Sequence, residues 1–307
     1  MRIRRIGVLL AVVALLGAGC GDDDPEEGSA STTTAPAAVS GPQQYTVAVD
    51  GPSVLGAENV AYATYFPKRV AVRPGDSVLF DNRSSNDVHT VTLGVKSDRS
   101  GQPFELLKSG QANPAVFAPC YTAEAVRPDI TCPPPTSGAP EFNGQGFWNS
   151  GVLLPTALPP EAGSKTATVK LAAEIPPAAY TITCLLHPYM EATIDVVATD
   201  EARRSPAEVT AAGDGELAAA KAHAGTVPVP APPAATNGAS VVAGWSDRQV
   251  AVNRFHPETV SVKVGQTVAW RGASTWMPHT VSFQAPFRGP AEPDALLPAG
   301  TKSGGRF

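Results

Sequence analysis

The chain has little charge, few aromatic residues and few cysteines, and these shortages narrow what the protein can be. Asp, Glu, Lys and Arg together make up 17% of the 307 residues, the net charge is −5, and no long basic run is present. A nucleic-acid-binding surface needs clustered basic residues, so no nucleic-acid partner is expected. Aromatics stand at 7%, whereas 31 prolines and 28 glycines interrupt the chain. This composition favours short strands joined by turns over a helical bundle.

The N-terminal segment does not have the pattern of a folded domain. Three arginines within the first five residues precede the apolar run 6–19, and Cys20 follows this run directly. A basic start followed by an apolar stretch too short to span a bilayer is typical of a secretory signal. The wording LLGAGC resembles a bacterial lipobox, so residues 1–19 are predicted to be a lipoprotein signal peptide and Cys20 the lipidated residue. An ordinary signal peptide that is cut nearby is the alternative.

Residues 20–42 are first acidic and then rich in Ser, Thr, Ala and Pro, which predicts a disordered tether. With a lipid on Cys20, this tether would hold the protein to the cell membrane at its extracytoplasmic face. Disulfides persist in that compartment, and Cys120 and Cys132 flank a Pro-containing stretch, so these two cysteines are predicted to pair. Cys184 then has no partner. An unpaired cysteine in an exported protein needs an explanation, and metal ligation is one.

Two stretches of the chain match without a gap, Phe66–Leu93 and His256–Phe283, and this match aligns His89 with His279. Both alternate apolar and polar residues around a glycine turn, which predicts strands. Several short strands at this spacing favour an antiparallel sandwich. No Cys, His or Met follows His279, so the second copy cannot complete a metal site like that of the first. It is either a truncated copy or a domain that lost its metal.

Between the copies, Ser205, Pro206 and Glu208 fit the start of a capped helix, which the glycines at 213 and 215 are expected to interrupt. A Pro-rich linker follows. The predicted organisation is therefore a complete domain over 43–199, a helix and linker over 200–240, and an incomplete second domain over 241–307.

The segment YTITCLLHPYM places Cys184, His187 and Met190 three residues apart, between two alternating stretches. Chance would make these a buried cysteine, a surface histidine and a core methionine. The alternative is one soft metal site, to which His89 brings a second imidazole from a distant strand. A thiolate, two imidazoles and a thioether suit copper, whereas structural zinc sites favour several thiolates.

The segments YTITC, CLLHPYM and EATIDV, with PGDSVLFDNRSSNDVHTV upstream, resemble the cupredoxin family of type 1 blue copper proteins. The ligand spacing is most similar to amicyanin among the plastocyanin-like domains. The resemblance implies an all-β fold, a cupredoxin-like antiparallel Greek-key β-sandwich, with one copper per chain. It implies His89, Cys184 and His187 as equatorial ligands and Met190 as the axial ligand. Thr90 departs from the asparagine that often follows the first histidine.

The resemblance implies a carrier of single electrons and not an enzyme. Redox partner proteins would dock near His187, on an apolar patch of Leu185, Leu186, Pro188 and Tyr189. A copper protein for storage, delivery or sensing, or a metal-free interaction module with this fold, is the alternative. The five histidines, without a His-x-His pair, cannot furnish the further copper centres of multicopper oxidases.

Overall fold

The computed structural model describes residues 41–52, 59–94, 118–122, 140–187, 189–199, 203–277, 279–281 and 283. All of them lie in one compact unit, Ser40–Phe307. The predicted signal peptide, Cys20, nearly all of the tether and Cys132 lie outside the described residues, so those assignments stay predictions. In the part of the chain that is described, no helix has the length and apolar character needed to cross a membrane.

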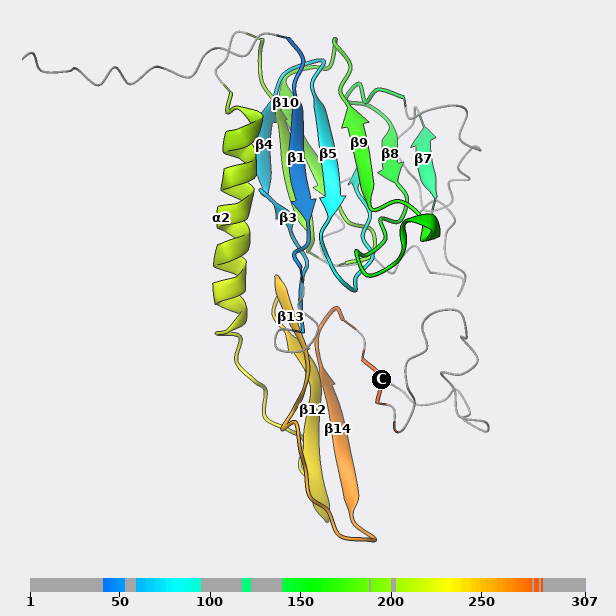
Figure 1. The fold of residues 1–307 in the computed structure, drawn as a ribbon, viewed down its shortest axis with the longest axis vertical. Coiled ribbons are helices and arrows are strands. Elements are labelled where there is room, and N and C mark those ends of the chain that lie inside the picture. Colours follow the sequence, from blue (N-terminus) through cyan, green and yellow to red (C-terminus); the bar gives the residue numbers. More distant parts are fainter. Residues whose placement is uncertain are drawn as a thin grey trace, which may run out of the picture. The chain divides into compact units, whose positions relative to one another are not determined.

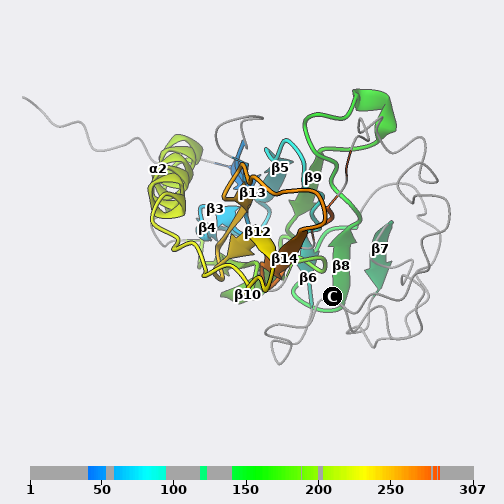
Figure 2. The ribbon, with the colours of Figure 1, turned by 90° about the horizontal axis from the view of Figure 1, so that it is seen from below.

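Two sheets face each other in the first copy (Figure 1). One has the order β3 (Tyr65–Phe66), β1 (Gln44–Val49), β5 (Ser77–Asn82) and β9 (Thr166–Lys170). The other has the order β4 (Arg69–Val72), β11 (Glu191–Val196), β10 (Ala178–Thr183), β6 (Thr92–Leu93), β8 (Phe147–Ser150) and β7 (Pro119–Thr122). Figure 2 shows β6, β8 and β7 in succession. A single 3₁₀ turn, Pro160–Ala162, is described before β9.

The sheets share one apolar core, because alternate residues of their strands point inward. In β5, for example, Val78 and Phe80 are fully buried whereas Leu79 between them is not. Both join a cluster with Val70, Leu93 and Ile194 from the other sheet. The predicted β-sandwich is therefore confirmed.

The expectation of a purely antiparallel sandwich is wrong. β1 runs parallel to β5, and β4 runs parallel to β11, while the other pairs in these two sheets are antiparallel. The alternating pattern of a strand specifies which face is buried, but it does not specify the direction of a neighbour that arrives from far along the chain.

The helix between the copies, α2 (Pro206–Ala224), begins with the predicted capping box of Ser205 and Glu208. The predicted interruption at residues 213–215 is wrong, because the helix continues through them. Gly213 is buried against the backbone of the first copy, where an added Cβ would lie 2.8 Å from the carbonyl oxygen of Phe66. The glycine therefore allows close packing of the helix, which contacts β1 and β3.

The second copy contributes three strands to a sheet of the order β14 (Thr267–Ala273), β12 (Gly238–Ser246), β13 (Val250–His256) and β2, in which β2 (Val60–Tyr62) comes from the first copy. β12 pairs with one antiparallel and one parallel strand, as β1 does. Val242 pairs with His256 as Ala48 pairs with Phe66, and β12 runs parallel to β14 as β1 runs parallel to β5. The structural repeat therefore also includes β1 and β12, which precede the segments that match in sequence.

Candidate metal centre

Three elements position the predicted ligands. His89 lies in a bridge to Leu153 just before β6, with backbone hydrogen bonds in both directions. Cys184 follows the last residue of β10, and His187 lies in the loop that leads to β11. The N–H of Cys184 donates to the carbonyl oxygen of Met190 over 3.0 Å, which closes this loop. The ligand loop is therefore held by the β10–β11 ladder at its base.

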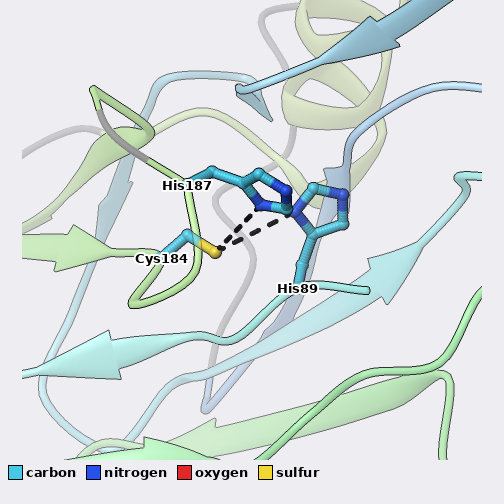
Figure 3. Close-up of side chains that lie close together, drawn as sticks. All are labelled: His89, Cys184 and His187. Carbon is cyan, nitrogen blue, oxygen red and sulfur yellow. Dashed lines mark hydrogen bonds between the residues drawn. The ribbon is translucent and has the colours of Figure 1, made fainter. Parts of the chain in front are cut away.

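The structure brings His89, Cys184 and His187 together (Figure 3). The Cys184 sulfur lies 3.5 Å from Nδ1 of His187 and 4.0 Å from Nδ1 of His89. All three side chains are buried, and their donor atoms lie within 4.8 Å of one another. Over the described residues, this is the single group of three or more potential metal ligands. The predicted convergence of a distant strand histidine on the Cys-x2-His loop is confirmed.

Thr90 holds the sulfur from the side of the first histidine. Its N–H donates to the Cys184 sulfur over 3.4 Å, and its hydroxyl lies 3.9 Å from the same atom. The hydroxyl also accepts from the N–H of Leu185 over 2.7 Å. Thr90 therefore ties the ligand loop to the His89 segment, so the departure from asparagine at this position does not leave the sulfur without a hydrogen bond.

Asp50 was not predicted from the sequence, yet it contacts His89 directly. Its carboxylate is fully buried, and one oxygen lies 3.0 Å from Nε2 of His89. The other oxygen accepts from the N–H groups of Gly51 and Tyr62, over 2.6 and 2.8 Å. A carboxylate at Nε2 holds a proton there and leaves Nδ1, which faces Cys184, available as a ligand. An Asp-Gly pair after an alternating strand predicts only a turn.

The site favours the ligand form of the cysteine. Burial alone would raise the pKa of the Cys184 thiol, but hydrogen bonds from His187 and His89 lower it well below its ordinary value. Burial would likewise lower the pKa of His89, but Asp50 and Cys184 raise that pKa to about 10. A thiolate is the form of cysteine that binds metals. The raised pKa of His89 keeps a proton on its Nδ1 near neutral pH, and a metal ion would have to displace that proton on binding.

The donor set fits copper. One thiolate and two imidazole nitrogens converge in a buried site, and these soft and borderline donors suit a single copper ion. Met190 is fully buried and belongs to the same core cluster as Cys184. Its role as the axial ligand stays a prediction. Cys120 is buried in β7, and its pairing with Cys132 also stays a prediction, because Cys132 lies outside the described residues.

The residues around His187 differ from the expected apolar patch. Leu185 is buried, Leu186 is partly buried against the core, and Tyr189 is 45% exposed, while Pro188 lies outside the described residues. His187 itself is only 9% exposed, because the ring of Trp276 lies against it, with ring centroids 5.7 Å apart. Trp276 belongs to the second copy, and no motif in the sequence pointed to it.

His279 does not join the centre. It is half-buried beside Gly244, where an added Cβ would lie 2.0 Å from its Nε2 atom. Burial lowers the pKa of this imidazole, and Nε2 has no hydrogen-bond partner in the described part of the chain.

Comparisons with known proteins give structural matches only. No family model and no curated protein matches the chain. A reduced auracyanin from Roseiflexus castenholzii matches at 17% identity, with 50% of this chain and 96% of that chain covered and a TM-score of 0.27. Auracyanin A, a "blue" copper protein from Chloroflexus aurantiacus, matches at 15% identity, with 51% and 100% covered and a TM-score of 0.28.

A purple cupredoxin from Nitrosopumilus maritimus matches at 10% identity, with 50% of this chain and 99% of that chain covered and a TM-score of 0.24. Identities and TM-scores this low do not assign a site. The assignment of the metal centre therefore rests on its own geometry.

Proposed function

We propose that the chain is a blue copper protein of the cupredoxin type that carries single electrons. The observation behind this proposal is the buried cluster in which the Cys184 sulfur faces Nδ1 of both His89 and His187. Bound copper would supply the one-electron redox chemistry. The three residues would hold the copper, together with the thioether of Met190.

Electron transfer is fast when the ligands move little between oxidation states. Hydrogen bonds from neighbouring groups restrain the ligands of this centre. His89 is held by Asp50, Cys184 by Thr90, and the ligand loop by the hydrogen bond from Cys184 to Met190. Burial of the cluster also excludes water. These constraints favour a rigid site that keeps its geometry through a redox cycle.

The location and partners belong to the same proposal. A lipid on Cys20 and the tether of residues 20–42 would hold the protein at the outer face of the cytoplasmic membrane. Redox partner proteins would dock near His187, where Tyr189 is exposed on the ligand loop. The protein would exchange electrons with these partners and would catalyse no reaction of its own.

A storage or delivery protein must release its copper, and this requirement separates that alternative from the carrier. Release needs an open or mobile site, whereas His89 and Cys184 are each at most 1% exposed. The buried site therefore favours the carrier. The dense set of polar contacts to the ligands also disfavours a metal-free module, since a metal-free core gains little from a buried histidine–cysteine cluster.

Voltammetry combined with copper extraction tests the proposal. The copper-loaded protein is expected to show a reversible one-electron couple and to lose copper slowly to a chelator of moderate affinity. Rapid surrender of copper without a reversible couple would contradict the carrier and favour delivery.

A further inference from the structure

The second copy is joined to the first beside the metal centre. β13 pairs with β2, with Val250 opposite Tyr62, and the N–H of Ala63 donates to the carbonyl oxygen of Gln249 over 3.0 Å. The N–H of Tyr62 also donates to Asp50, the carboxylate that holds His89. One short strand therefore carries both the support of a ligand and the attachment of the second copy.

Trp276 is held in place by the end of β12 and the turn that follows it. Its indole N–H donates to the carbonyl oxygen of Asp247 over 2.7 Å. Ser246 accepts from the N–H of Thr275 over 2.8 Å, and its hydroxyl bonds that of Ser274 over 3.1 Å. The position of the indole is thus fixed by the polar groups of its own copy and does not depend on the metal loop alone.

Residues of the second copy contact His187 and Tyr189 of the ligand loop. The rings of Trp276 and His187 meet edge to face, with an interplanar angle of 82°, and Trp276 is only 4% exposed. The guanidinium of Arg248 lies 5.4 Å from the centre of the Tyr189 ring, in a cation–π contact. Trp276 also joins the apolar core cluster that contains Cys184.

We propose that Trp276 and Arg248 form a fixed cover over the metal centre, which we call the Trp276 cover. Trp276 shields the His187 ring from water and small reagents, and Arg248 restrains the ligand loop through Tyr189. A redox partner that docks near His187 would then meet the cover and Tyr189 before the histidine. As a feature of a copper centre, the cover rests on the proposed function, but the shielding itself is a property of the apoprotein.

Histidine modification in the apoprotein tests the shielding without copper. Diethyl pyrocarbonate carbethoxylates accessible imidazoles, and peptide mass mapping gives the rate for each histidine. In the unmodified chain, His187 is expected to react much more slowly than the exposed His256. Trp276→Ala should raise the His187 rate by about tenfold or more, because a buried group reacts only through local opening. Trp270→Ala is the matched control in the same copy, since Trp270 contacts Phe255 and Phe283 instead.

The outcomes separate the cover from the proposed function. Equal rates for His187 and His256 in the folded, unmodified chain would overturn the cover, and this comparison does not depend on whether a variant folds. An unchanged His187 rate in Trp276→Ala with native circular dichroism would overturn it as well. A protected His187 in a chain that gives no blue copper spectrum would support the cover and refute the proposed function alone.

Discussion

In the first copy the repeated histidine, His89, faces a carboxylate, whereas in the second copy its counterpart, His279, lies against a glycine. The strand registers align Asp50 after β1 with Gly244 in β12. Both residues have a positive φ, 58° and 68°. A Cβ at Gly244 would overlap the His279 ring, so no carboxylate has room there. Closely similar strands therefore place the same residue type in two different chemical environments.

The comparison shows what a metal centre needs beyond a repeated strand pattern. Both copies form a central strand with one parallel and one antiparallel neighbour. In the first copy, the centre also uses Asp50 from before the matching segment and Cys184 and His187 from long after it. The matching segment itself contributes His89 and Thr90. A histidine at the repeated position is thus not sufficient for a site.

The two copies also differ in burial. Val72 is fully buried and its counterpart Val262 is 44% exposed, and Leu93 is fully buried while Phe283 is 76% exposed. The two sheets of the first copy bury these side chains between them. The same apolar pattern in the second copy is only partly covered by the described residues. Val72 lies in β4, whereas residues 259–262, which align with β4, form no strand. Apolar alternation alone therefore predicts neither every strand nor how much each copy buries.

The largest expected difference between the two copies is the change in copper affinity when His89 or His279 is replaced. His89→Ala should lower the affinity by more than about 100-fold, because loss of a ligand exceeds the 10–100-fold cost of losing its outer partner. His279→Ala should leave the affinity unchanged. Competition titrations with a copper chelator measure both. A comparable loss in the His279 variant would show that the second copy contributes a ligand.

The next difference is in stability. Val72→Ala removes two methyl groups from a filled core, so we expect the free energy of unfolding to fall by about 2–3 kcal/mol. The same change at Val262 should cost no more than about 0.5 kcal/mol, since that side chain is already partly in water. Urea unfolding followed by circular dichroism compares the two. Equal losses would contradict the difference in burial.

A smaller effect is expected from the carboxylate that distinguishes the copies. Asp50→Asn keeps the shape of the side chain but removes its charge, and it should weaken copper binding by about 10–100-fold. The reduction potential should rise, because a less basic His89 stabilises oxidised copper less. Asp81→Asn, at a partly exposed carboxylate paired with Arg83, is the control. An unchanged potential in the Asp50 variant would show that the carboxylate is only structural.

The sequence predicted the ligands better than their surroundings. Cys184 and His187 share one short loop, and His89 stands at a repeated position near the start of a strand, so residue type and spacing were enough to group them. Asp50 and Trp276 were missed because neither belongs to a motif. Each reaches the site through strand pairing between distant segments, β2 with β13 in the case of Trp276.

The fold was predicted in its elements but not in all of its pairings. Alternation gave the strands β4, β5, β9, β10, β11 and β14, but residues 259–262 of the second copy, which align with β4, form no strand. The capping residues gave the start of α2, yet the parallel pairs and the continuity of α2 were not foreseen. Gly213 illustrates the reason. A glycine within a helical stretch predicts a break from its intrinsic propensity, whereas tertiary packing against Phe66 makes the same residue necessary.

The visible and electron paramagnetic resonance spectra of the protein during copper titration test the central claim most directly. We predict that one copper per chain produces an intense sulfur-to-copper charge-transfer band, together with the narrow copper hyperfine pattern of a thiolate site. The band should be absent from a folded Cys184→Ser variant. A colourless complex, two tightly bound coppers, or an unchanged band in that variant would contradict the assignment of one blue copper centre to His89, Cys184 and His187.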